Sequence, residues 1–362
     1  MKVTLSVVSN DEKSPLMRLT KASRLTQGKG KKSLVAAALA SVLGLGGAGF
    51  AAQAATIGND QWPDLTALGA NSSQGEARAQ MLNHTPRVMA RVQMNELRKR
   101  MGNIRAAEGD SGVWTRYNGG QFSGDGALET DFHMIQAGVD TMPSPDSARF
   151  GLALSYANAQ AQDPLSSADT DSVSLSGYAL WAAPTGLFAD VIARMAKSDT
   201  DYRFGLHSAK FDHISLSTSV EVGWRFDVHR LAFIEPSAEL TYTYTDATHF
   251  SLGNASHAIG STDSLIARAG FLAGIRCPRG LADAYVRVAT VHELLGDTSM
   301  VSTVSGTSHT FSTKGQDSWI EYALGVNYKF NPATYLYADV ERTAGAQIEE
   351  DWRANLGVRY SF

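Results

Sequence analysis

Long apolar stretches, paired cysteines and an excess of positive charge are all missing from this chain of 362 residues. Beyond residue 54, no stretch is long and apolar enough for a transmembrane helix. The one cysteine, Cys277, excludes an internal disulfide, and the histidines are scattered. No phosphate-binding glycine loop and no zinc-protease motif occurs. We therefore expect no cofactor and no metal site.

The first 54 residues have the pattern of a secretory signal peptide. Residues 1–32 contain eight Lys or Arg and two acidic residues, and an apolar run follows from 33 to 50. Ala52-Gln53-Ala54 then matches a small-residue cleavage site, which argues against the alternative of a membrane anchor. Removing residues 1–54 leaves 24 basic and 34 acidic residues, a net charge of −10. That balance argues against a nucleic-acid partner.

Alternation of apolar and polar residues dominates the end of the sequence. Over residues 351–362 every second residue is apolar: Trp352, Ala354, Leu356, Val358, Tyr360 and Phe362. Twelve residues at a period of two suffice for a tilted strand to cross a bilayer with one lipid face and one wet face. We expect the outward aromatic residues Tyr360 and Phe362 to act as an assembly signal.

Similar alternation predicts an all-β fold over residues 109–362, a twelve-stranded antiparallel transmembrane β-barrel. Composition alone does not exclude a soluble barrel or a β-sandwich. Three polar stretches, 159–170, 246–263 and 296–316, are expected to be external loops, and 227–230 and 331–332 to be periplasmic turns. The twelve predicted strands are 112–122, 129–141, 148–158, 171–183, 186–198, 212–227, 230–245, 265–276, 281–293, 317–330, 333–343 and 351–362.

A cationic helix is predicted ahead of the barrel. Residues 55–86 form a short linker or exported segment, and residues 87–108 are rich in Arg and Lys with helix-forming neighbours. About twelve strands enclose a lumen wide enough for one helix. The predicted inward strand faces are charged, which indicates either a water-filled, salt-bridged interior or an acidic patch that holds this helix in the pore. The inward acids include Asp190, Glu221 and Glu239.

Two patterns resemble enzyme motifs but lack the context for catalysis. Gly109-Asp110-Ser111-Gly112 matches the nucleophile motif of serine proteases, yet it lies at the predicted helix-to-strand turn, where these residue types are common. A nucleophilic serine also needs a histidine and a carboxylate placed by a folded domain. Ser256-His257 lies in a predicted loop rather than in a strand, which argues against a lipase. We therefore do not expect a serine protease.

Several motifs in order along the chain resemble the translocator domain of autotransporters, in particular the serine-protease autotransporters of enteric bacteria. The resemblance covers residues 90–362. It implies a monomeric barrel in the outer-membrane lipid of a Gram-negative cell, assembled by the barrel assembly machinery with periplasmic chaperones. The motifs are MNELRKRMGNIR (94–105), GVWTRY (112–117), QAGVD (136–140), FADVIARM (188–195), VEVGWRF (220–226), IEPSAELTY (234–242) and RANLGVRYSF (353–362).

The resemblance also implies a single self-cleavage inside the pore. The side-chain amide of Asn95 would attack its own backbone carbonyl and cut the chain before Glu96, with Asp190, Glu221 and Glu239 assisting. The sequence departs from this subgroup at Glu96, where a second Asn is expected, and the added negative charge would slow the reaction. The alternative is that Asn95 is simply a polar residue of the pore helix.

The expected passenger of an autotransporter is nearly absent. Passengers of this family run to hundreds of residues, whereas only residues 55–95 remain here. An orphan translocator, a gene remnant and a protein with a very short exported peptide all stay open. Two other functions also stay open: a passive outer-membrane pore or structural barrel, and an outer-membrane hydrolase.

Overall fold

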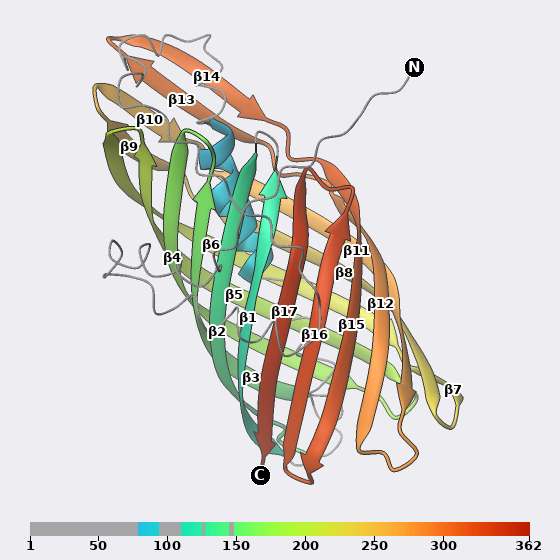
Figure 1. The fold of residues 1–362 in the computed structure, drawn as a ribbon. Helices are drawn as coiled ribbons and strands as arrows, with labels where there is room; N and C mark the ends of the chain where they lie inside the picture. The colour runs from blue at the N-terminus through green and yellow to red at the C-terminus, as the bar shows by residue number, and fades with distance from the viewer. Residues whose placement is uncertain (1–78, 94–109, 125–126, 145–147) are drawn as a thin grey trace, which may run out of the picture. The chain divides into compact units, whose positions relative to one another are not determined.

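A computed structural model describes residues 79–93, 110–124, 127–144 and 148–362. The expected signal peptide and the residues that follow it up to 78 lie outside this range. Most of the described chain is strand, and residues 79–93 are helical (Figure 1). Within the described part, no helix is both long and apolar enough to span a membrane.

The described strands are antiparallel to their neighbours and form two sheets. The first sheet contains all strands except β9, β10, β13 and β14. The strands are β1 (Ser111–Gly124), β2 (Leu128–Thr141), β3 (Arg149–Gln162), β4 (Ser166–Ala182), β5 (Leu187–Phe204), β6 (His207–Trp224), β7 (Phe226–His229), β8 (Ala232–Thr245), β9 (Thr248–Leu252), β10 (Ala255–Ile259), β11 (Thr262–Arg276), β12 (Ala282–Glu293), β13 (Thr298–Val304), β14 (Thr307–Thr313), β15 (Asp317–Asn331), β16 (Thr334–Ala344) and β17 (Ile348–Ser361).

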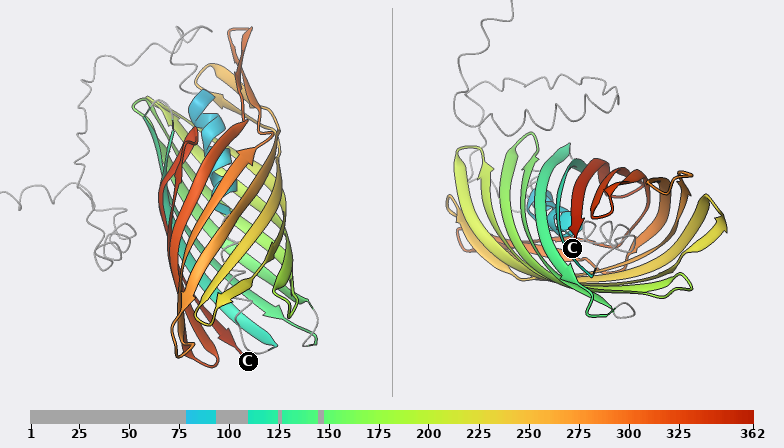
Figure 2. Two further views of the ribbon diagram at one scale, coloured as in Figure 1. Left: turned by 90° about the vertical axis from the view of Figure 1, so that its right-hand side faces the viewer. Right: turned by 90° about the horizontal axis from the view of Figure 1, so that it is seen from below.

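The large sheet closes into a barrel (Figure 2). The wall strands pair with one another in chain order. In this order β6 pairs with β8 and β8 pairs with β11, and β1 pairs with β17 to close the sheet. Because β7 continues β6 beyond Arg225 and also pairs with β8, these two segments count as one wall strand. The predicted twelve-stranded antiparallel barrel is therefore confirmed.

The seam between the first and last strands is fixed by backbone and side-chain bonds. The Ser111 amide donates to the Phe362 carbonyl at 3.3 Å, and the Phe362 amide donates back at 3.0 Å. From β17, Arg359 reaches across β1 and donates to both oxygens of Asp140 on β2, at 2.6 and 2.7 Å. This charged pair is buried, so it ties the last strand to the second as well as to the first. We call this end of the barrel the terminal end.

The outer surface of the barrel is apolar over its middle. On β6, the outward residues Ile214, Leu216, Val220 and Val222 are 42–49% exposed. From Trp181 to Val173, β4 advances about 26 Å, which is about 20 Å along the barrel axis at a tilt of about 40°. This is close to the height of the apolar band, about 25 Å, that lipid-facing barrels present.

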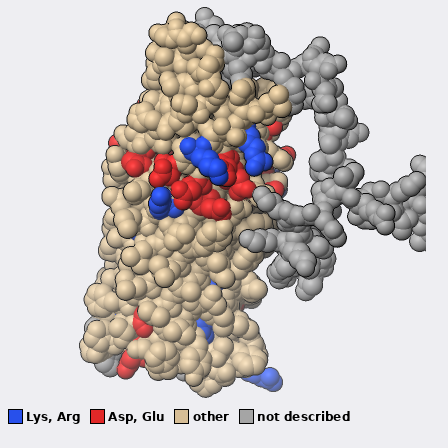
Figure 3. Space-filling model, turned by 90° about the vertical axis from the view of Figure 1, so that its left-hand side faces the viewer, with Lys and Arg blue, Asp and Glu red and all other residues tan. Residues whose placement is uncertain are grey.

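Charged and aromatic side chains border this apolar band. Away from the terminal end, Lys197 on β5 contacts Asp199 and, on β6, Asp212, at 3.7 and 3.3 Å. Figure 3 shows a band of acidic and basic residues across one face, with a large uncharged surface below it. At the terminal end, the outward rings of Tyr360 and Phe362 lie 6.2 Å apart. Aromatic residues at the border of an apolar band mark a membrane interface.

The second sheet forms a cap at the opposite end, which we call the hairpin end. Two hairpins, β9–β10 and β13–β14, are joined by the pairing of β10 with β13. Apolar residues of these hairpins and of the barrel rim pack in one cluster with Ala79, Met81 and Leu82 of the helix. The cluster includes Tyr202, Phe204, Phe211, Phe250, Leu252, Ile259 and Met300. The upper part of the helix is therefore enclosed by an apolar core.

The prediction of three external loops is wrong. The stretches 246–263 and 296–316 contain the hairpins β9–β10 and β13–β14, and most of 159–170 is strand, because β3 runs to Gln162 and β4 starts at Ser166. Beyond the lipid band the outward face of these strands contacts water. Their outward residues are therefore not apolar, and the alternation that predicts a strand is missing. The inward residues of β3 and β4 in the stretch 159–170 are instead small: Ala159, Ala161 and Ala168 pack around the helix.

The described helix includes residues 79–86, which lie ahead of the segment 87–108 that was expected to be the pore helix. The expected boundary at residue 87 follows from Pro86, which removes one helical hydrogen bond and costs about 3 kcal/mol. Met81 and Leu82 are at most 1% exposed, and burying two such side chains contributes about 1.5–3 kcal/mol each. Burial in the cap therefore offsets the proline. The rest of the predicted helix, from 94 to 108, lies outside the described residues.

Candidate functional site on the barrel wall

Three acidic side chains form a row across the inner wall, which we call the acidic row. Asp190 of β5 lies opposite Glu221 of β6, and Glu221 lies opposite Glu239 of β8. Directly opposite residues on neighbouring strands have Cβ atoms about 4.5–5.5 Å apart. All three are buried, with exposures of 2–7%. Residues from three strands thus concentrate carboxylates at one level of the lumen.

Glu239 is held by hydrogen bonds on both of its oxygens. Its Oε2 accepts from Arg268 Nη1 at 2.8 Å, and its Oε1 accepts from Ser219 Oγ at 2.9 Å and Thr241 Oγ1 at 3.0 Å. Arg268 of β11 lies opposite Glu239 and so extends the acidic row by one basic residue. Because both carboxylate oxygens of Glu239 already accept hydrogen bonds, Glu239 is suited to hold the neighbouring side chains in position.

Asp190 and Glu221 lie beside Glu239 and provide two further carboxylates. Glu221 lines the lumen cavity toward the terminal end, together with Glu239 and Arg268. Asp190 is 2% exposed and occupies the next strand. Adjacent carboxylates can accept, hold or pass on a proton from a group placed between them. The acidic row could therefore assist a reaction that needs proton transfer within the pore.

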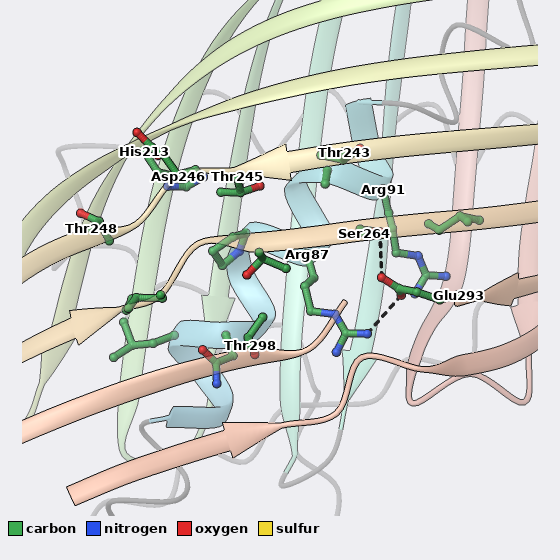
Figure 4. Close-up of a pocket in the computed structure, with 18 of the residues that line it drawn as sticks. Arg87, Arg91, His213, Thr243, Thr245, Asp246, Thr248, Ser264, Glu293 and Thr298 are labelled. Atoms are coloured by element: carbon green, nitrogen blue, oxygen red, sulfur yellow. Dashed lines mark hydrogen bonds and ion pairs between the residues drawn. The ribbon is translucent and has the colours of Figure 1, made fainter. Parts of the chain in front are cut away.

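The helix contacts the barrel wall through polar side chains along its length. His84 Nε2 lies 3.1 Å from Thr130 Oγ1, and Arg87 Nη2 donates to Glu293 Oε2 at 3.2 Å. Figure 4 shows Arg87 and Ser264 both reaching the Glu293 carboxylate. These contacts support the prediction that a cationic helix lies inside the pore, although Glu293 rather than the acidic row pairs with Arg87.

Arg91 is anchored mainly by aromatic rings and a backbone carbonyl. Its Nη1 donates to the Ile348 carbonyl at 2.6 Å. Its guanidinium carbon lies 4.4 Å from the ring centre of Trp319 and 5.4 Å from that of Phe122. Cation–π contacts of this kind strengthen when water is excluded, and Arg91 is buried. The arrangement fixes the depth of the helix in the lumen.

A chain of contacts connects the helix to the acidic row. Trp319, which lies under Arg91, donates from Nε1 to Glu321 Oε1 at 3.3 Å. Glu321 accepts two hydrogen bonds from Arg268, at 2.9 and 3.0 Å, and Arg268 in turn holds Glu239. Further along the helix, Gln93 Nε2 donates to Ser172 Oγ at 2.7 Å. The described part of the helix therefore ends at Gln93, in contact with Ser172 of β4.

The structure brings together only part of the predicted site. Asp190, Glu221 and Glu239 share one wall, whereas Asn95 and Glu96 lie outside the described residues. Tyr360 and Phe362 are on the outer surface, 51% and 68% exposed. The catalytic and assembly roles of all these residues stay predictions.

Sequence reasoning missed the partners that seat the helix. Glu293 could have been found, since it follows the inward phase of Arg287, Ala289 and Val291 on β12. Trp319 and the Ile348 carbonyl carry no signal in a single sequence, because an aromatic ring inside a wet lumen breaks the alternation rule.

Ser111, from the protease-like motif, is part of the seam. Its Oγ lies 3.0 Å from Thr141 Oγ1, and its backbone pairs with Phe362. It thus serves as the first residue of β1. None of the described residues forms a group of three or more His, Cys, Asp or Glu side chains that could hold a metal ion.

Comparison with known sequences finds the autotransporter β-domain family over residues 113–341. Among curated proteins, the serine protease Sat autotransporter of Escherichia coli O6:H1 is 26% identical over an alignment of 289 residues, and the match covers 75% of this chain and 22% of that protein. The SepA serine protease autotransporter of Shigella flexneri gives 26% identity with 75% and 21% coverage. The chain thus spans about a fifth of the length of these relatives.

Solved structures show the same fold. The translocator domain of the autotransporter NalP from Neisseria meningitidis superposes with a TM-score of 0.65 at 13% identity, covering 78% of this chain and all of that one. The β-domain of the Bordetella autotransporter BrkA gives a TM-score of 0.56 at 22% identity, with 70% and 100% coverage. At these identities the likeness concerns the fold of the barrel.

Proposed function

This chain belongs to the autotransporter β-domain family, and from that membership we propose that its barrel carries the segment ahead of the helix across the outer membrane. The barrel is of the outer-membrane translocator type by family and fold. We infer that the signal peptide first exports the chain to the periplasm, where chaperones and the barrel assembly machinery receive it as a monomer.

The direction of the helix is the observation that carries this proposal. Its first described residues pack with β9, β10 and β13 at the hairpin end. By contrast, Asp110 lies at the terminal end, where its carbonyl accepts from the Met142 amide at 2.6 Å. The described helix thus starts at the hairpin end and β1 starts at the terminal end, which is the order needed to leave the N-terminal part at the hairpin end. With the terminal end in the periplasm, that part is outside the cell.

We further propose that the barrel cuts this chain once, between Asn95 and Glu96. The Asn95 side-chain nitrogen attacks the Asn95 backbone carbon, the C–N bond to Glu96 breaks, and a proton from the attacking amide passes to the leaving nitrogen. An amide is a weak nucleophile, so this transfer needs a carboxylate close by. Two observations support the assignment: the acidic row faces the lumen, and Gln93, two residues before Asn95, also lies in the lumen, where it donates to Ser172 of β4.

A surface tag tests the proposed transport. An epitope inserted between residues 72 and 73, in an Asn95→Asp background that keeps it attached, should bind antibody on intact cells. The same epitope inserted between residues 332 and 333, at the terminal end, should bind only after the outer membrane is opened. Detection of the first epitope only after opening would show that the barrel holds its N-terminal segment in the periplasm, as a passive pore or structural barrel would.

A further inference from the structure

Two cavities follow one another along the inner face of strands β8 and β11. The upper cavity, of about 50 Å³, lies between these strands and the helix and is lined by Thr241, Thr243 and Thr245 of β8 with Thr262 and Ser264 of β11. The lower cavity, of about 380 Å³, continues along the next inward residues of the same strands, including Glu235, Ser237 and Glu239. We call this continuous strip of wall the β8–β11 track.

Arg268 is the side chain that separates the two cavities. It lines both of them and is 8% exposed. It is also fixed from two directions, because Nη1 donates to Glu239 on β8 while Nε and Nη2 donate to Glu321 on β15. Three charge-assisted hydrogen bonds hold the guanidinium in one orientation. Arg268 therefore crosses the track at a fixed position.

The lining of the upper cavity is mostly apolar, but it includes residues with buried polar atoms that lack protein partners. Four buried atoms that belong to its lining residues have no hydrogen-bond partner among the described protein atoms: Asn83 Oδ1, Arg91 Nη2, His213 Nδ1 and Thr298 Oγ1. Buried polar groups without protein partners are usually satisfied by water. Figure 4 shows several of these side chains around the gap beside the helix. Water at these atoms would extend down to Arg268.

The lower cavity is charged, and its balance depends on Arg268. Its lining holds four acidic residues, Glu221, Glu235, Glu239 and Asp283, against three basic ones, Arg225, Arg268 and Arg287. The lining thus carries one net negative charge with Arg268 present and two without it. Rings of acidic side chains favour cations in a pore. A path opened at Arg268 would therefore prefer cations.

We propose that the β8–β11 track is an ion path that remains beside the seated helix, and that Arg268 closes it. The helix fills the lumen on the side of β1–β4, where Val88, Met89 and Val92 pack with Phe122, Phe132 and Ala157. On the side of β8 and β11, Arg268 is the one side chain of the described residues that lines both cavities. The proposal concerns the closed state of the barrel and does not depend on self-cleavage at Asn95.

Single-channel recording in planar bilayers tests the proposal, on a purified mature chain that carries Asn95→Asp to keep the helix joined to the barrel and serves as the wild-type reference. Arg268→Ala should raise the conductance roughly tenfold over the wild type, and the reversal potential in a KCl gradient should indicate cation preference. Arg194→Ala is the matched control, because Arg194 is a buried lumenal arginine of β5 that donates to Ser176 and lies outside the track. Its conductance should stay near that of the wild type.

Thiol chemistry distinguishes an opened track from a displaced helix. In a Cys277→Ser background, Arg268→Cys should conduct, a cationic methanethiosulfonate should close it again, and an anionic one should leave it open. If Arg268→Ala does not assemble, Arg268→Lys provides the same test with an intermediate conductance, because an ammonium cannot bridge both carboxylates. Wild-type conductance in assembled Arg268 variants, or an equal rise in Arg194→Ala, would overturn the proposal.

Discussion

Replacing Asn95 by Asp should leave the mature chain uncut in the outer membrane. A carboxylate at this position lacks the amide nitrogen that attacks the backbone carbonyl, so the cleavage rate should fall beyond detection. Glu239→Ala should slow the cut by at least about 10²-fold, the lower end of what general acid–base groups contribute. Mass spectrometry of the outer-membrane fraction measures both effects, since the cut form begins at Glu96.

Glu96→Asn provides the gain-of-function control for the same reaction. The Glu96 side chain adds a negative charge next to the scissile bond, close to where carboxylates must take up a proton. Removing that charge should speed the cut, whereas Glu341→Gln, which changes a buried lumenal acid of β16 that pairs with Arg287, should leave it much less affected than Glu239→Ala. An uncut chain in both the wild type and Glu96→Asn would show a translocator that does not cleave itself.

Replacing Phe362 by Asp should abolish assembly into the outer membrane. Phe362 is 68% exposed next to Tyr360 at the border of the apolar band, and its backbone closes the seam with Ser111. A basic residue on the lipid face of a barrel costs about 2–4 kcal/mol at the bilayer midplane and about 0–1 kcal/mol near its interfaces, and an acidic residue costs less. If Phe362 is also an assembly signal, the loss should exceed that cost. The readout is the heat-modifiable band of the folded barrel.

Phe330→Asp separates the two explanations. Phe330 on β15 is also an outward aromatic residue at the terminal end and is 66% exposed. A signal that resides in the last strand predicts normal assembly of Phe330→Asp and failure of Phe362→Asp. Equal failure of both variants would mean that charge at this depth blocks insertion, and that Phe362 has no special role.

The barrel could be predicted because lipid and water impose opposite demands on alternate residues. On β6, the outward Ile214, Val220 and Val222 face lipid, while the inward Ser217, Ser219 and Glu221 are buried in a polar interior. This contrast persists along each membrane-spanning strand, so one sequence sufficed to count twelve of them. It also placed Asp190, Glu221 and Glu239 in the lumen, since their phase follows from their apolar neighbours.

Structure beyond the lipid band could not be predicted in the same way. In the cap, Phe250 and Met300 are buried against the helix and the barrel rim, and the outward faces of these hairpins are wet. No lipid-facing side chains mark these strands, so their Ser and Thr residues are typical of loops. The pairing of β10 with β13 joins residues about 45 apart, which a local pattern does not encode.

The contacts that hold the helix in the lumen could not be predicted from the sequence either. Arg91 is held by Trp319, Phe122 and the Ile348 carbonyl, so a rule that pairs basic residues with acidic ones misses all three partners. In the sequence, Arg268 likewise cannot be told apart from the other lumenal charges. Only the structure shows that it is ion-paired with both Glu239 and Glu321. Such contacts depend on which strands curve toward one another across the lumen.

The position of the helix in intact cells is the most direct test of the whole account. In a Cys277→Ser, Asn95→Asp background, which keeps the helix joined to the barrel, a cysteine at Val88, which is 0% exposed, is compared with one at Ser308 on the exposed β14. A bulky, membrane-impermeant maleimide should label Ser308→Cys on intact cells and leave Val88→Cys unlabelled until the barrel is heat-denatured. Equal labelling of both cysteines on intact, folded barrels would contradict a helix seated in the pore.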